Sequence, residues 1–206
     1  MDAARVVPVE FRGPATPVLR GLLFGAGERW AVLVHGEGQD LDAWLPLARW
    51  LAERNVCVLA FDLPGHGASD DPWEPALVLP SVMAAIEFAR SRGSQNVHLI
   101  GAGVGAVAAL AAAAHGERDP ASIVALSPKL VDRVADLAGA REARVPKLIL
   151  VGSLDGDAVE DADAVFRGAI GHCELTKFPV AEQGADLLGG EWGTHVREKV
   201  LAHLMH

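Results

Sequence analysis

Short apolar runs alternate with longer amphipathic stretches along the 206-residue chain. Six of the runs consist mainly of aliphatic and β-branched residues without strict polar alternation, which is typical of strands buried on both faces of a parallel sheet. These predicted strands are Trp30–Val34, Val56–Phe61, Val97–Ile100, Ile123–Leu126, Lys147–Val151 and Glu174–Phe178.

Two earlier runs, Val6–Phe11 and Leu19–Phe24, are separated by a Gly-Pro pair and predict an antiparallel hairpin. Apolar positions at helical spacing fill the remaining intervals, and Asp42 is the expected cap of the first helix. The predicted helices are Ala43–Glu53, Val78–Arg90, Val104–His115, Leu130–Leu137, Val159–Ile170 and Thr194–Met205.

Strands that alternate with helices over short connections predict an α/β fold. We expect a doubly wound, mostly parallel sheet with an antiparallel hairpin at its start. Because neither composition nor complexity changes along the chain, residues 1–206 are predicted to form a single domain. Ligands of such folds bind at the carboxyl ends of the strands, so the residues that follow each strand carry most of the functional information.

Composition and charge narrow the classes of function. The chain is 50% hydrophobic and 22% charged, with 18 basic against 27 acidic residues and a net charge of −9. This balance predicts a folded cytoplasmic protein that binds neither nucleic acid nor membrane. The two cysteines, Cys57 and Cys173, form no metal-binding spacing, and we predict no metal or cofactor. The oligomeric state is left open.

Three glycine-rich turns directly follow predicted strands: HGEG at 35–38, DLPGHGAS at 62–69 and GAGVG at 101–105. In this order, and together with GSLD at 152–155 and AEQGADLL at 181–188, they resemble the α/β-hydrolase family. The resemblance covers nearly the whole chain and implies an α/β-hydrolase fold. Since only a short segment separates the strands that end at 126 and begin at 147, it implies a core without a cap domain, similar to small carboxylesterases and dienelactone hydrolases.

The resemblance also implies where a catalytic triad would stand. The nucleophile position falls on Gly103, the acid on Asp155 and the histidine on Gln183, with Asp157 as an alternative acid. Glycine has no side chain with which to attack a carbonyl, and an amide does not transfer protons near neutral pH. Two of the three positions therefore lack their catalytic group.

The resemblance also implies an oxyanion pocket, formed by the HGEG turn at 35–38 and by the start of the helix predicted at Val104–His115. The backbone N–H groups of Glu37 and Val104 would donate whatever their side chains are. A carboxylate at Glu37 opposes a developing oxyanion, so we consider two interpretations: a solvent-facing side chain, or a base or cation-binding group. The implied pocket residues are His35, Gly36, Glu37, Gly38, Val104 and Leu154, and the residues expected to flank the pocket are Trp44, Trp73, Leu154 and Trp192.

Other interpretations of these motifs fit less well. The GAGVG turn lacks the G-x-G-x-x-G spacing of a dinucleotide site, although Ala106 suits its last position. Asp155 and Asp157 could simply cap the next helix, and their spacing does not match a calcium loop. His98 is expected in the core, whereas Cys173 is expected at the amino end of the last strand, away from the site.

These observations lead to two hypotheses about function, beside a third interpretation as an oligomeric scaffold without a ligand. The first is a non-catalytic protein of hydrolase fold that binds a small molecule or a partner. The alternative is a weak or altered hydrolase or lyase that acts on a small ester or carbonyl compound through Glu37 or Asp155.

Overall fold

An eight-stranded sheet forms the centre of the computed structural model, which describes residues 5–115, 119–131, 138–139 and 141–205. Its strand order is β1-β2-β4-β3-β5-β6-β7-β8, with antiparallel β1–β2 and β2–β4 pairs and parallel pairing elsewhere. The predicted hairpin and mostly parallel sheet are confirmed. The strands are β1 (Val6–Phe11), β2 (Leu19–Phe24), β3 (Arg29–Val34), β4 (Val56–Phe61), β5 (Asn96–Ala102), β6 (Ser122–Leu126), β7 (Lys147–Gly152) and β8 (Cys173–Phe178).

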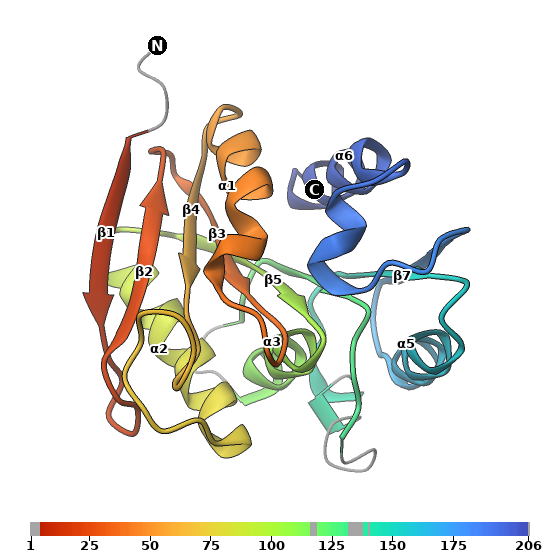
Figure 1. Cartoon of the computed structure of the whole chain (residues 1–206), viewed down its shortest axis with the longest axis horizontal. Coiled ribbons are helices and arrows are strands. Elements are labelled where there is room, and N and C mark those ends of the chain that lie inside the picture. Colours follow the sequence, from red (N-terminus) through yellow and green to blue (C-terminus); the bar gives the residue numbers. More distant parts are fainter. Residues whose placement is uncertain (1–4, 116–118, 132–137, 140, 206) are drawn as a thin grey trace.

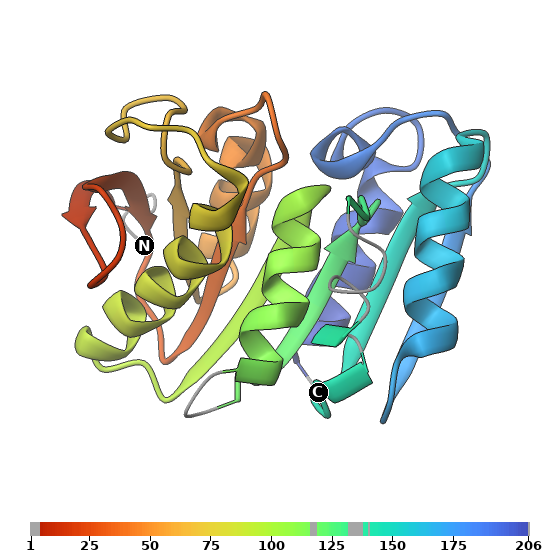
Figure 2. The same cartoon turned by 90° about the horizontal axis from the view of Figure 1, so that it is seen from below.

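Helices cover both faces of the sheet, as Figures 1 and 2 show. Helices α1 and α6 lie on one face, and α2, α3 and α5 lie on the other, so that each face has its own apolar core. Within the described residues no helix is both long and apolar enough to cross a bilayer. The helices are α1 (Leu45–Ala52), α2 (Val78–Ser91), α3 (Val104–His115), α5 (Gly156–Gly168) and α6 (Gly193–Leu204), with short 3₁₀ turns η1 (Leu41–Trp44), η2 (Pro75–Leu77) and η3 (Gly184–Leu188).

Most predicted helices are found within a few residues of their expected bounds, and α3 matches them at both ends. The first helix differs, because it is preceded by η1, whose cap is Asp40 and not Asp42. Asp40 is extended, and its carboxylate accepts a hydrogen bond from the Asp42 N–H at 2.9 Å. The predicted helix at 130–137 lies largely outside the described residues. β6 and β7 are joined by residues 127–146, and the described part of the chain contains no cap domain, as expected.

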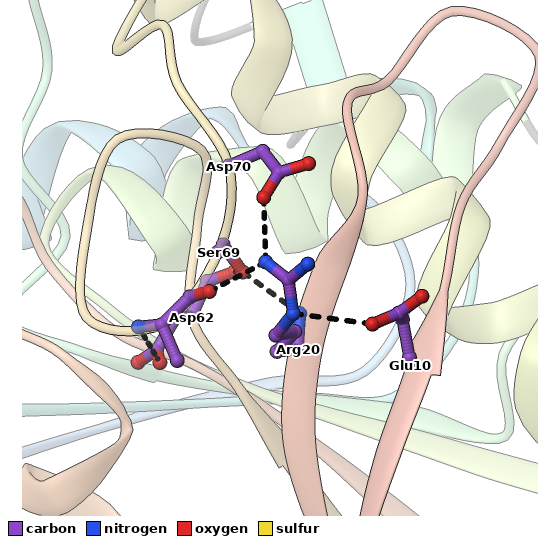
Figure 3. A network of polar contacts seen from close by, with 6 residues as sticks. Glu10, Arg20, Asp62, Ser69 and Asp70 are labelled. Atoms are coloured by element: carbon purple, nitrogen blue, oxygen red, sulfur yellow. Dashed lines mark hydrogen bonds and ion pairs between the residues drawn. The ribbon is translucent and has the colours of Figure 1, made fainter.

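The DLPGHGAS segment at 62–69 fixes the loop that follows β4. The Asp62 carboxylate is 2% exposed and accepts hydrogen bonds from the N–H groups of Leu41 and Ala68, each at 2.8 Å. Ser69 links this loop to β2, because its hydroxyl donates to the Asp62 carbonyl at 2.6 Å and accepts from the Arg20 N–H at 2.8 Å (Figure 3). The side chain of Arg20 in turn pairs with Glu10 and Asp70. This motif therefore has a structural role.

Two histidines join the turns after β3 and β4. The buried His35 ring accepts a hydrogen bond from the Leu63 N–H at 2.9 Å through Nε2, which leaves its Nδ1–H to donate to the Gly36 carbonyl at 2.8 Å. In the opposite direction, His66 Nε2 accepts from the Gly38 N–H at 3.3 Å. Burial lowers the pKa of His35, which favours the neutral ring that this arrangement requires.

Candidate functional site

β5 passes directly into α3 through a sharp elbow at Gly103. The φ angle of Gly103 is +55°, in the left-handed region that glycine adopts without strain. A Cβ atom at this position would meet only the Gly36 Cα within 4 Å, at an ordinary contact distance of 3.6 Å. By contrast, a Cβ at Gly101 or Gly105 would overlap neighbouring backbone atoms. Gly101 and Gly105 are thus required by close packing, whereas Gly103 has room for a side chain.

Two backbone donors border the elbow. Val104 is the first residue of α3, where N–H groups have no acceptor inside the helix. Among the described residues, neither the Val104 N–H nor the Glu37 N–H has a hydrogen-bond acceptor. The Glu37 side chain is half exposed and lies 3.5 Å from Lys129 Nζ at the surface. The free N–H groups can therefore receive a carbonyl or carboxylate oxygen.

Asp155 follows β7 and uses both of its carboxylate oxygens. Oδ1 accepts a hydrogen bond from the Ala158 N–H at 3.1 Å and so caps α5. Oδ2 accepts a hydrogen bond from the side-chain amide of Gln183, which follows β8. Asp155 is therefore a helix cap, and it also contacts the residue after the last strand. Asp157, the alternative acid, is exposed and makes no such contact in the described structure.

These groups share an open cleft of about 630 Å³ at the carboxyl ends of the strands. Its walls come from the turns after β3, β5, β6, β7 and β8, the places where ligands of α/β sheets bind. Residues far apart in sequence, such as Gly36, Gly103, Asp155 and Gln183, are brought together there.

Ser127 is one of the cleft residues that the sequence did not single out. It directly follows β6 beside the elbow, where the Gly103 N–H donates to the Leu126 carbonyl at 3.1 Å. Its φ is +43°, unusual for a residue with a side chain. Ser127 is 5% exposed, and its hydroxyl has no hydrogen-bond partner among the described residues.

A sequence comparison decides the family. The profile of the alpha/beta hydrolase family matches residues 31–200. The chain belongs to the alpha/beta hydrolase family. That match includes every turn described above, from the residues after β3 to those after β8.

Solved structures of an esterase and a dienelactone hydrolase share the fold. An esterase from Pyrococcus furiosus is 16% identical, with a TM-score of 0.83 over 98% of this chain and 91% of that chain. A dienelactone hydrolase from Anabaena variabilis is 19% identical, with a TM-score of 0.79 over 99% of this chain and 98% of that chain. At these identities the likeness concerns the fold alone.

One curated relative is the uncharacterized protein YfhR of Salmonella typhimurium, which is 35% identical over 85 residues. The alignment covers 40% of this chain and 29% of that protein, so it spans less than a third of the relative's length.

Within the alpha/beta hydrolase frame, the structure separates the expected pocket residues into two groups. Gly36, Glu37 and Val104 line the cleft together with Gly103. His35, Gly38 and Leu154 do not line it. His35 is fully buried beneath the turn, and Leu154 is 70% exposed.

The tryptophans expected to flank the pocket also lie elsewhere. Trp44 is fully buried in the core beside α1, and Trp73 packs edge-on against the His66 ring at 4.6 Å. Trp192 contacts the Phe178 ring at 5.8 Å between their centroids. The cleft wall is instead polar, and none of these three tryptophans contributes to it.

The structure also shows where two residues outside the motifs, His98 and Cys173, lie relative to the cleft. His98 is buried in β5, its Nδ1 lies 2.8 Å from Ser122 Oγ, and burial lowers its pKa to about 4. Cys173 begins β8 at the amino end of the strand, and burial raises its pKa. Both interpretations made from the sequence are confirmed: neither residue lines the cleft.

Proposed function

We propose that this alpha/beta hydrolase is a non-catalytic protein that binds a small carbonyl-containing ligand at the Gly103 elbow. The main support comes from the elbow itself. It has a left-handed backbone and two free N–H donors beside it, as expected of a site that binds an acyl group, but the residue at its centre is glycine. Without a side chain, Gly103 cannot form a covalent acyl intermediate.

The residue opposite the elbow supports the same proposal. Gln183 donates its amide to Asp155, so the acid is occupied by a partner that does not titrate. A triad needs a base that takes the proton of the nucleophile, and an amide cannot do this near neutral pH. What remains is a polar cleft with donors for a carbonyl oxygen.

The alternative is a hydrolase or lyase that uses Glu37 or Asp155 as a base. It has less support, because Glu37 pairs with Lys129 and both carboxylate oxygens of Asp155 already accept hydrogen bonds. An enzyme of this kind would lose turnover in Glu37→Gln or Asp155→Asn. Turnover that neither substitution changes would remove this alternative.

The proposal is tested by combining an activity arm with a binding arm. We expect the wild-type protein to show no labelling by a fluorophosphonate probe and no esterase activity above that of Ser127→Ala. Titration with the neutral probe hexanamide should shift the NMR signals of the Glu37 and Val104 amides. Labelling that disappears in Ser127→Ala would identify Ser127 as a nucleophile and overturn the proposal. The proposal would also be overturned if neither hexanamide nor its cationic analogue 5-aminopentanamide shifted these signals.

A further inference from the structure

The cleft is much more acidic than the rest of the chain. Overall, 27 acidic residues face 18 basic ones. Among the described residues that line the cleft, one basic side chain, Lys129, faces six carboxylates: Glu37, Asp155, Asp157, Glu160, Asp161 and Asp186. A cleft with walls of one sign of charge concentrates ligands of the opposite sign.

The six carboxylates are not equally available. Asp155 binds Gln183 and Ala158, Asp161 accepts a hydrogen bond from the Leu130 N–H at 3.0 Å, and Glu37 lies beside Lys129. Asp157 and Asp186 are exposed at the rim, and neither forms an ion pair with any described residue. These two side chains are therefore available to a bound cation.

The second observation comes from the buried wall of the cleft. In the part of the chain that the structure describes, four buried side-chain polar atoms have no hydrogen-bond partner, and among them only Ser127 Oγ belongs to a residue lining the cleft. A buried hydroxyl without a partner is unfavourable, because it has given up its hydrogen bonds to water without replacing them. A ligand that reaches the elbow next to Ser127 can supply the missing hydrogen bond.

The arrangement of the carboxylates favours an organic cation over a metal ion. In the described residues, no three His, Cys, Asp or Glu side chains are grouped closely enough to hold a metal ion. The charges are instead distributed around a cleft of about 630 Å³. An ammonium group on a flexible chain can reach such a rim while the other end of the molecule occupies the elbow.

We infer that the ligand of this cleft is an amino-carbonyl compound, whose carbonyl oxygen lies at the Glu37 and Val104 N–H groups beside the Ser127 hydroxyl and whose ammonium group lies at the rim formed by Asp157 and Asp186. The carbonyl end rests on the proposed function. The positive charge is an addition to it, and the two parts can be tested separately.

Four probes of similar length test separately whether the cleft recognises the charge and the carbonyl group of a ligand. Hexanamide is neutral, 5-aminopentanamide replaces its terminal methyl by an ammonium group, adipamate replaces it by a carboxylate, and pentylamine keeps the ammonium but lacks the carbonyl. Dissociation constants are measured by NMR titration at low and high salt. We expect 5-aminopentanamide to bind about 5- to 10-fold more tightly than hexanamide, adipamate to bind most weakly, and the preference to shrink at high salt.

Three variants locate the two ends of the ligand. The double variant Asp157→Asn/Asp186→Asn should abolish the preference for 5-aminopentanamide while it leaves hexanamide binding unchanged. The control Glu191→Gln/Glu198→Gln removes two exposed carboxylates outside the cleft and should keep the preference. Ser127→Ala should weaken 5-aminopentanamide and hexanamide by the same factor.

Each outcome decides one part of the inference. Equal affinities for hexanamide, 5-aminopentanamide and adipamate would overturn the inference of a positively charged ligand and leave the proposed function standing. That inference would also be overturned if the preference for 5-aminopentanamide survived in Asp157→Asn/Asp186→Asn. If pentylamine bound as tightly as 5-aminopentanamide, the binding of a carbonyl group at the elbow would be overturned, and with it the proposed function. The inference of a cationic ligand would remain. If none of the probes bound, both would be overturned.

Discussion

The side-chain amide of Gln183 donates a hydrogen bond to the carboxylate of Asp155. In a catalytic triad the acid makes the corresponding contact with a histidine, whereas an amide does not titrate. Under the proposed function, the Asp155–Gln183 pair has the contact of such a dyad without its proton chemistry, and it provides a starting point for introducing activity.

Esterase activity should appear in the double variant Gly103→Ser/Gln183→His. A side chain fits at Gly103, since its Cβ would lie 3.6 Å from the Gly36 Cα, and a ring at position 183 could donate to Asp155. Because general-base catalysis contributes about 10²–10⁴-fold, the double variant should exceed Gly103→Ser alone by on the order of 100-fold. The measurement is hydrolysis of p-nitrophenyl acetate, and a folded double variant with no gain would contradict the prediction.

Removing the side chain of Ser127 should stabilise the fold. Ser127→Gly relieves a φ of +43° and removes a buried hydroxyl that has no partner among the described residues, which together should raise the free energy of unfolding by about 1–2 kcal/mol. Ser127→Ala keeps the strained backbone and should give a smaller gain. Urea denaturation of the three proteins measures this, and a destabilised Ser127→Gly would show that the hydroxyl has a structural partner.

The cap formed by Asp155 predicts a difference between two substitutions. Asp155→Ala removes the acceptor of the Ala158 N–H and should lower the free energy of unfolding by about 1 kcal/mol. Asp155→Asn retains a capping oxygen and should cost only a few tenths of that value. If chemical denaturation gave equal losses for both, the cap would not be the source of the stabilisation.

The loop after β4 depends on Asp62 more than on its charged neighbours. Asp62→Ala removes a buried carboxylate and leaves the partly buried N–H groups of Leu41 and Ala68 without an acceptor, and should cost about 1–3 kcal/mol. Asp70, whose side chain is 48% exposed, pairs with Arg20 at the surface, so Asp70→Ala should cost much less. Comparable losses of unfolding free energy in the two variants would contradict this prediction.

His98 makes stability depend on pH. Its pKa is lowered from 6.5 to about 4 by burial, so between these values the unfolded chain binds a proton that the folded chain does not. The contribution of neutral His98 to the free energy of unfolding is therefore complete above pH 6.5. This contribution decreases by about 3 kcal/mol as the pH falls towards 4. His98→Leu/Ser122→Ala removes the ring and its partner together, and should reduce the slope of unfolding free energy against pH in this range. An unchanged slope would assign the effect to other groups.

The strands and most helices could be predicted because their apolar patterns run over complete elements and continue into the two cores. Turn motifs gave the positions of Gly103, Asp155 and Gln183, since a glycine-rich turn after a strand has a fixed place at the sheet edge. The direction of single side chains in loops was not predictable. Trp44 lies in the connection after β3 and Leu154 in the one after β7, yet Trp44 packs inward and Leu154 faces solvent.

Ser127 shows a second limit. Its φ is positive although it carries a side chain, and no local sequence rule marks such a residue. Asp186 was visible within the last motif, but its position on the rim depends on how η3 folds back over the sheet.

The Asp155 carboxylate also begins α5, so this residue has a role in the fold that does not depend on any chemistry in the cleft. Under the proposed function, the helix needs an acceptor at this position whether or not the protein turns over a substrate. The presence of the acid is therefore by itself no evidence of catalysis.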